Sequence, residues 1–123
     1  MKSDFRDLEI WQLGKALRTE VYELCKNLPK EENYKLKDQM IRASRSITAN
    51  LAEGYGRFHY QENIQFCRQA RGSLFELIDH FTVCLECGYL DEDRFAVFEN
   101  NIKEIVKKLN GYIKYLRTKK DTN

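Results

Sequence analysis

The strongest constraint on the fold lies near the C-terminus, where apolar residues repeat with the period of a coiled coil. Seven of them follow one another at alternating steps of three and four: Phe95, Phe98, Ile102, Ile105, Leu109, Tyr112 and Leu116. This heptad pattern places the seven side chains along one face of an α-helix. A helix with a long apolar face is stable only when other helices cover that face, so the pattern predicts a helical bundle.

Shorter apolar stripes at helical spacing predict three more helices upstream. With the heptad helix, they run at about residues 7–27, 33–55, 60–87 and 91–118. Pro29, Gly54-Tyr55-Gly56 and Gly88 mark the helix ends, and Asp91 is a suitable N-cap for the last helix. The predicted core stripes upstream of the heptad helix are Ile10, Gly14, Leu17, Val21, Leu24 and Leu28; Leu36, Met40, Ala43, Ile47 and Leu51; and Cys67, Ala70, Leu74, Leu77, Phe81 and Cys84. Short connections of about four to six residues favour an all-α, antiparallel up-down-up-down four-helix bundle.

Length and composition set the class of protein. With 123 residues and one proline, the chain is expected to form a single domain over residues 1–123. Its apolar runs are far shorter than the ~20 residues that span a bilayer, and the charged N-terminus has no signal-peptide core. We therefore expect a cytoplasmic protein with reduced cysteines and no membrane partner.

The cysteines allow a metal-site interpretation, which competes with a structural one. His80, Cys84 and Cys87 are spaced so that a helix places all three on one face, where they could hold zinc with Cys25 or Cys67 as a fourth ligand. The same positions belong to the predicted core stripe, where reduced cysteine packs as a small hydrophobe. No second ligand pair is present, so core cysteines are the preferred interpretation, and we expect no metal and no cofactor.

No residue set typical of catalysis is evident. The Gly54-Tyr55-Gly56 segment follows a predicted helix rather than a strand and has no Gly-Lys-Ser/Thr ending, so it is interpreted as a helix stop and not a phosphate loop. His59 has no acid or nucleophile near it in sequence. The chain is therefore expected not to be an enzyme.

Positive charge is concentrated in two stretches, although the formal net charge is only +2. The candidate nucleic-acid-binding residues are Arg42, Arg45, Arg57, Arg68 and Arg71 in the first stretch and Lys107, Lys114 and Arg117 in the second. Tyr112 and Tyr115 are interleaved with the second set, and basic patches with aromatic residues bind phosphates and stack bases. The alternative is a solvated helix face with cations that suit the C-terminal end of a helix dipole.

Other polar residues suggest a structural role. Asn50, Glu53, Ser73 and Glu76 lie at similar bundle depth, and they predict a network of Arg–Glu and Asn–Ser pairs that fixes the register of the second and third helices. A catalytic role for these residues is the less favoured interpretation.

The chain also has more apolar surface than a four-helix core needs. A second face of the first helix carries Trp11, Tyr22 and Cys25, and the second helix carries the small residues Ala49, Ala52 and Gly56 beside Arg45. Such faces indicate a subunit interface, so we expect a homo-oligomer. The alternative is a wide bundle whose flanks these residues line.

Three sequence blocks resemble a known family. They are FRDLEIWQ at residues 5–12, SITANLAEGYGR at 46–57 and FCRQARGSLFEL at 66–77. Together they are similar to the 23S rRNA intervening-sequence proteins, over about residues 5–118, and to the accessory variability determinant of diversity-generating retroelements. The resemblance implies an antiparallel four-helix bundle, a homopentameric ring, a basic surface that binds RNA or DNA, and no established enzymatic activity. Thr48 stands where the family usually has proline, so the second helix is expected to be straighter here.

These observations predict a non-catalytic, oligomeric module that binds nucleic acid. The alternative is a protein-interaction scaffold in which acidic and apolar faces dock a protein partner.

Overall fold

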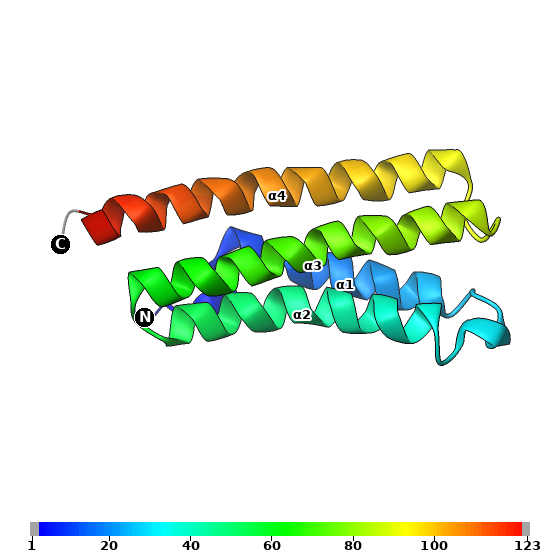
Figure 1. Ribbon diagram of the computed structural model, residues 1–123, viewed down its shortest axis with the longest axis horizontal. Helices are drawn as coiled ribbons and strands as arrows, with labels where there is room; N and C mark the ends of the chain where they lie inside the picture. Colours follow the sequence, from blue (N-terminus) through cyan, green and yellow to red (C-terminus); the bar gives the residue numbers. More distant parts are fainter. Residues whose placement is uncertain (1–2, 122–123) are drawn as a thin grey trace.

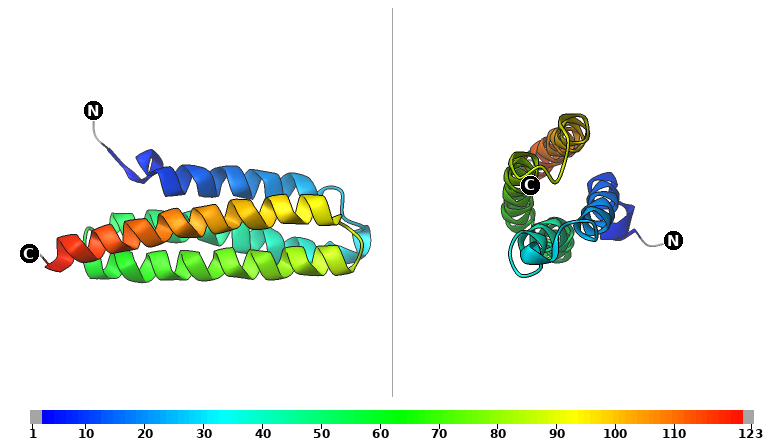
Figure 2. Two further views of the ribbon diagram at one scale, coloured as in Figure 1. Left: turned by 90° about the horizontal axis from the view of Figure 1, so that it is seen from above. Right: turned by 90° about the vertical axis from the view of Figure 1, so that its right-hand side faces the viewer.

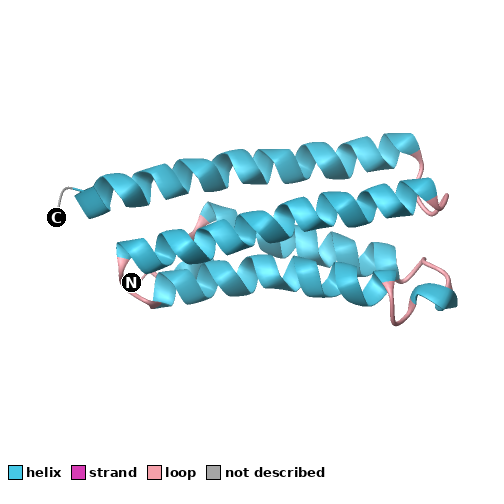
Figure 3. Cartoon of the chain, in the orientation of Figure 1, coloured by secondary structure: helices cyan, strands magenta, loops and turns pink. Residues whose placement is uncertain are grey.

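Helices account for nearly all of the structure (Figure 1). The computed structural model describes residues 3–121, and over that range the chain has four α-helices and no strand (Figure 3). The helices are α1 (Glu9–Cys25), α2 (Leu36–Gly56), α3 (Tyr60–Glu86) and α4 (Glu92–Asp121). Two short 3₁₀ turns, Phe5–Asp7 and Lys30–Glu32, precede α1 and α2. The predicted all-α fold is confirmed.

Each helix runs antiparallel to the one before it, as the prediction of an up-down-up-down bundle requires (Figure 2). Neighbours in sequence pack closely along their lengths, whereas α1 and α4 meet at few positions, which leaves that side of the bundle more open. The N-terminal part of α1, the C-terminal part of α2, the start of α3 and the end of α4 therefore lie at one end of the molecule.

The predicted apolar stripes form the core. Every residue predicted for the first three stripes is buried. In the heptad stripe of α4, Phe98, Ile102, Ile105, Leu109 and Leu116 are buried, and Phe95 and Tyr112 are half-buried against the core. Burial of side chains of this size stabilises the fold by about 1.5–3 kcal/mol each, so this interior is the main source of stability.

Several helix boundaries differ from the prediction. The first helix begins at Glu9 rather than at residue 7, because Asp4 caps the preceding 3₁₀ turn by accepting from Arg6 N at 2.7 Å. Residues 26–35 connect α1 to α2, which is longer than the predicted four to six residues and includes a 3₁₀ turn. Helix α4 starts after Asp91, whose carboxylate accepts from Arg94 N at 2.8 Å, and it runs to Asp121 rather than to residue 118.

Gly54 has a packing role that the sequence did not reveal. Helix α2 ends at Gly56, within the predicted Gly54-Tyr55-Gly56 terminator, but Gly54 itself is helical and buried. A Cβ added at Gly54 would lie 2.8 Å from Asn63 Oδ1 and 2.8 Å from Phe66 Cβ. Glycine at this position therefore allows α2 and α3 to approach closely near their connection.

Thr48 lies inside α2, which is continuous from Leu36 to Gly56. Its side chain is buried, and its methyl group packs over Gly14 of α1. Its hydroxyl accepts from Arg18 Nη1 at 2.7 Å and donates to the Arg45 carbonyl at 3.2 Å. Thr48 therefore joins α1 to α2.

Candidate nucleic-acid interface

The antiparallel arrangement separates charge along the bundle. One half, made of residues 3–17, 47–73 and 107–121, contains 11 Lys or Arg and 6 Asp or Glu residues. The other half, made of residues 18–46 and 74–106, contains 9 Lys or Arg and 13 Asp or Glu residues. We refer to these halves as the basic end and the acidic end. The small net charge of the chain thus results from two opposite local charges, and local charge determines which ligands a surface attracts.

Two exposed side-chain hydrogen bonds connect α3 to α4 on one side of the basic end. Arg71 Nη1 donates to Asn110 Oδ1 at 2.7 Å, and Lys120 Nζ donates to Gln61 Oε1 at 2.7 Å. Residues three, four or seven apart share one side of a helix, so cations one turn away from these contacts lie on the same side of α3 and α4. We define the α3/α4 basic face as Arg68, Arg71, Lys107, Lys114, Arg117 and Lys120.

Five of the eight predicted nucleic-acid-binding residues belong to this face. Four of them, Arg68, Lys107, Lys114 and Arg117, are exposed, and their side chains form no hydrogen bond or ion pair with any residue of the described range 3–121. Arg71 is half-buried and bound to Asn110. Glu104, one turn before Lys107, marks the boundary with the acidic end.

The other three predicted arginines lie elsewhere. Arg42 pairs with Asp38 at 2.8 Å on an exposed turn of α2. Arg57, at the end of α2, pairs with Glu53 at 2.9 Å and places its guanidinium 5.2 Å from the centre of the Phe66 ring. Arg45 faces α1. Arg42, Arg45 and Arg57 therefore do not share one surface with Arg68 and Arg71.

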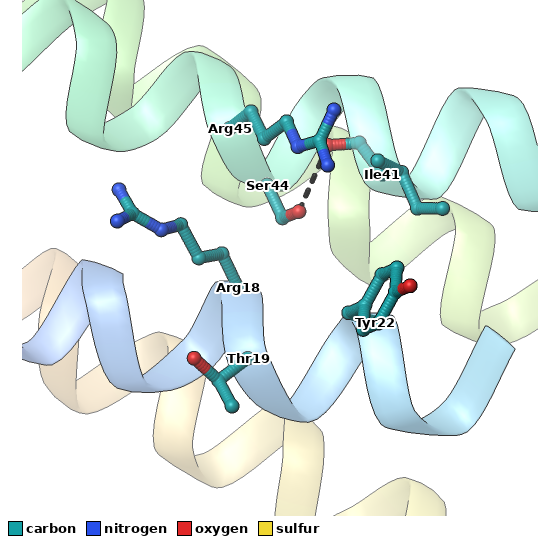
Figure 4. Close-up of a pocket in the computed structure, with 6 residues that line it drawn as sticks. All are labelled: Arg18, Thr19, Tyr22, Ile41, Ser44 and Arg45. Carbon is teal, nitrogen blue, oxygen red and sulfur yellow. Dashed lines mark hydrogen bonds between the residues drawn. The ribbon is translucent and has the colours of Figure 1, made fainter. Parts of the chain in front are cut away.

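Arg45 lines a groove between α1 and α2 (Figure 4). One part of this groove has a volume of about 220 Å³ and is lined by Arg18, Thr19, Tyr22, Ile41, Ser44 and Arg45. It continues past the two arginines to a part lined by Phe5, Trp11, Thr48, Ala49 and Ala52. The guanidinium of Arg18 lies 5.6 Å from the Trp11 ring centre, and Phe5 meets the same ring edge-on at 5.4 Å. The surplus face predicted on α1 and α2 is thus a groove with aromatic and cationic walls.

Cys25 does not belong to that groove. The sequence placed it on the second face of α1, but its side chain is 3% exposed and packs in the core. Its position at the C-terminal turn of α1 lets it reach α2, where Sγ lies 4.0 Å from the Lys37 carbonyl.

The predicted polar network divides into separate contacts. The hydroxyls of Ser46 and Ser73 lie 2.9 Å apart across α2 and α3, and Asn50 Nδ2 donates to Ser46 Oγ at 3.0 Å. Glu53 and Glu76, in contrast, are about half exposed and pair within their own helices, with Arg57 and His80 at 2.9 Å each. The Ser46–Ser73 contact therefore joins the two helices, whereas the Asn50–Ser46 contact lies within α2. Within residues 3–121, the expected Arg–Glu pairs between the helices are not formed.

The cysteines and His80 do not converge. Cys84 is buried with its Sγ 3.7 Å from Met40 Sδ, whereas Cys87, predicted to be in the core stripe, is exposed where α3 ends. Burial raises the pKa of the Cys67 thiol to about 12 and that of Cys84 to about 11, which keeps both protonated and unreactive. No group of three His, Cys, Asp or Glu residues within 3–121 is arranged to hold a metal ion.

The basic end also carries a cluster of aromatic side chains that the sequence analysis did not group. A pocket of about 290 Å³ lies at the end of the bundle where α4 extends beyond the first residue of α1. Its lining is Tyr55, Phe58, His59, Tyr60, Asn63, Tyr112, Tyr115 and Leu116. The available signal was the run of aromatic residues between positions 55 and 60. Tyr112, assigned to the core stripe, lies at the edge of this pocket, and its hydroxyl accepts from Asn63 Nδ2 at 3.3 Å.

None of the helices described over residues 3–121 is both long enough and apolar enough to span a bilayer.

Comparison with known proteins gives a family match and a similar fold. The sequence model described as 23S rRNA-intervening sequence protein matches residues 6–111. Among solved structures, the chain is similar to a protein of unknown function from the S23 ribosomal protein family of Bacteroides thetaiotaomicron, with a TM-score of 0.78 and 20% sequence identity. That similarity covers 85% of this chain and 98% of the other. No curated protein matches significantly.

Proposed function

This chain belongs to the 23S rRNA-intervening sequence protein family, and from that premise we propose that it is a non-catalytic module that binds the phosphate backbone of RNA or DNA. The observation that carries the proposal is the α3/α4 basic face, where four cations without an intramolecular partner in the described range line two packed helices. The family description refers to an rRNA insertion, which favours RNA as the ligand.

The physical basis of the proposal is counterion release. Each phosphate that a lysine or arginine neutralises frees a condensed counterion, so affinity falls as salt concentration rises. The packed helices fix the backbone position of each cation, and the Arg71 side chain loses little freedom on binding because Asn110 already holds it. The face therefore supplies affinity without reading sequence, because phosphate contacts position a nucleic acid but do not specify it.

The test is fluorescence anisotropy of a labelled single-stranded RNA at several salt concentrations. We expect the double variant Arg68→Gln/Lys114→Gln to bind about tenfold more weakly and to lower the salt slope by about 1.4, because each phosphate contact with a single strand contributes about 0.7. The matched control is Lys30→Gln/Lys35→Gln, which removes the same net charge from exposed positions at the acidic end. Equal losses in both variants would show that net charge, and not this face, controls binding.

We also propose that the protein is a homo-oligomer, a pentamer by resemblance to the family, that uses the α1/α2 groove as a subunit interface. Trp11 and Tyr22 offer aromatic area, and Ala49 and Ala52 allow a close approach. Light scattering after size-exclusion chromatography should give a mass several times 14.7 kDa, and Trp11→Ala should reduce it. A monomeric wild-type protein would contradict this part of the proposal.

A second candidate function follows from the same groove. Its aromatic and cationic walls also suit a protein partner, in which case the protein is a scaffold. Binding of a protein partner that is insensitive to salt, together with no binding of nucleic acid at low salt, would favour this alternative. In both cases we place the protein in the cytoplasm, because its buried thiols, Cys25, Cys67 and Cys84, are free.

A further inference from the structure

We propose that the aromatic residues at the basic end bind unpaired nucleobases of a single strand whose phosphates follow the α3/α4 basic face. This inference rests on the proposed function and narrows its ligand from nucleic acid in general to single-stranded segments. We define the aromatic end as Tyr55, Phe58, His59, Tyr60, Tyr112 and Tyr115, which come from the end of α2, the α2–α3 connection, the first residue of α3 and the last turns of α4.

The pocket exists because the helices differ in where they end. Helix α1 begins at Glu9, and Lys108 of α4 lies level with this residue, since their side chains are 3.3 Å apart. Helix α4 continues from there to Asp121 with no part of α1 beside it (Figure 2). The Tyr115 ring, which follows Lys108 on α4, is therefore half exposed to solvent instead of covered by a fourth helix, and the Tyr112 ring is half-buried at the edge of the pocket.

The aromatic rings are accessible to a flat ligand. Phe58 is 87% exposed, Tyr115 is 53% exposed and Tyr60 is 38% exposed. Tyr112 and Tyr115 lie nearly parallel, with ring centres 6.2 Å apart and 21° between the planes, so they present one extended π surface. Base–aromatic stacking is tolerant of sequence, because every base has a π face.

Phe58 also has an unusual backbone. It is the one non-glycine residue with a positive φ in the described range 3–121, at 52°. A phenylalanine in the left-handed region is unfavourable, and here the strain holds an apolar ring in solvent rather than in the core. Retaining strain to expose a ring is consistent with a binding role for that ring.

The charges around the rings favour a polyanion over other ligands that stack on aromatic residues. Lys119 places its ammonium 5.7 Å from the centre of the Tyr115 ring. Lys120, a member of the α3/α4 basic face, lines a second pocket together with Phe58, His59, Tyr60 and Gln61. Neither pocket has an acidic residue in its lining. A strand that leaves the α3/α4 basic face at Lys120 therefore reaches the aromatic end directly.

A duplex does not fit this arrangement as well as a single strand does. In a helical duplex the faces of the bases are stacked on one another, so exposed rings at one end of a bundle cannot reach them. An acidic peptide supplies charge for the lysines but no flat group for the rings. Only an unpaired strand uses both features.

The experiment compares three probes of equal length by fluorescence anisotropy: a single-stranded RNA, an abasic strand that keeps only the backbone, and a polyglutamate peptide. We expect the RNA to bind more tightly than the other two. The variants Phe58→Leu and Tyr115→Leu should each weaken RNA binding about fivefold or more, leaving abasic binding and the salt slope unchanged. The control Tyr34→Leu, at a residue that is 94% exposed at the acidic end, should bind like the wild type.

The outcomes separate this inference from the proposed function. If the RNA and the abasic strand bind equally, and the two variants bind RNA like the wild type, the aromatic end has no role but backbone binding stands. Polyglutamate binding as tight as RNA binding overturns the inference in favour of an acidic protein partner. If no nucleic acid binds at low salt, the proposed function itself fails. Quenching of a 2-aminopurine base in the strand, lost in Tyr115→Leu, reports stacking directly.

Discussion

The two ends of the bundle differ in how they are closed as well as in charge. At the acidic end the connections fold over the core: Leu28, Leu36 and Leu90 are buried, and Phe81 stacks on Phe98 with ring centres 4.4 Å apart. At the basic end α4 extends beyond the first residue of α1, and the rings of Phe58, Tyr60 and Tyr115 are exposed to solvent. The same kind of side chain thus provides stability at one end and an accessible surface at the other.

This difference shows how one short chain can combine a stable fold with a binding surface. Exposed aromatic rings contribute little to folding, so they are available for a ligand without weakening the core. Placing the cations at the same end brings attraction and stacking together, while the acidic end repels the same polyanion. Changes that affect the two ends unequally test this view.

The largest effect is expected at the closed end. Phe81→Ala removes a fully buried ring and leaves its stacking partner Phe98 beside a cavity, so we expect a loss of about 3–5 kcal/mol in the free energy of unfolding. At the open end, Tyr115→Ala should cost about 1 kcal/mol or less, because that ring is half exposed. Urea denaturation of both variants measures the difference, and equal losses would contradict the contrast between the ends.

A smaller effect tests whether the open end is nevertheless tightly packed between α2 and α3. Gly54→Ala places a Cβ 2.8 Å from Phe66 Cβ, so we expect a loss of about 1–3 kcal/mol. The matched control is Gly72→Ala in the middle of α3, where a Cβ meets nothing within 4 Å and should stabilise the helix by about 0.5–1 kcal/mol. Thermal or urea unfolding should therefore give opposite signs for the same substitution. A neutral Gly54→Ala would show that the helices separate easily.

Much of the fold was predictable because it depends on local periodicity. The heptad residues of α4 and the stripes of α1, α2 and α3 are buried because a helix with an apolar face must cover it, and this depends only on spacing along the chain. The packing role of Gly54 was missed because it depends on the close approach of Phe66 from a neighbouring helix. Local sequence does not contain that contact.

The binding surface was less predictable for a related reason. Arg42 and Arg45 fall in the same basic stretch of sequence as Arg68 and Arg71, yet only the last two lie on the side of α3 near α4, where Arg71 contacts Asn110. The aromatic end depends on where α1 begins. This start follows the 3₁₀ turn that Asp4 caps and the extended backbone of Leu8, and the apolar pattern does not give it. Which residues share a surface is thus decided by register between helices.

The smallest effect distinguishes the ends by pH. At the acidic end the Tyr89 hydroxyl donates to Glu32 at 2.9 Å, and this hydrogen bond to a carboxylate raises the pKa of Tyr89 to about 12. A tyrosine in the unfolded chain ionises near its ordinary pKa of about 10, so this contact stabilises the fold fully below that pH and is lost as the pH rises through 12. Tyr89→Phe should therefore be less stable than the wild type at pH 8, and this difference in the free energy of unfolding should disappear by pH 12.

At the basic end burial raises the pKa of Tyr112, but its hydroxyl accepts from Asn63, which opposes the shift. For Tyr112→Phe the difference in the free energy of unfolding from the wild type should consequently change less with pH. Urea denaturation between pH 8 and 12 compares the two variants. If the difference in stability between Tyr89→Phe and the wild type stays constant with pH, the Glu32 carboxylate does not hold the proton of the Tyr89 hydroxyl.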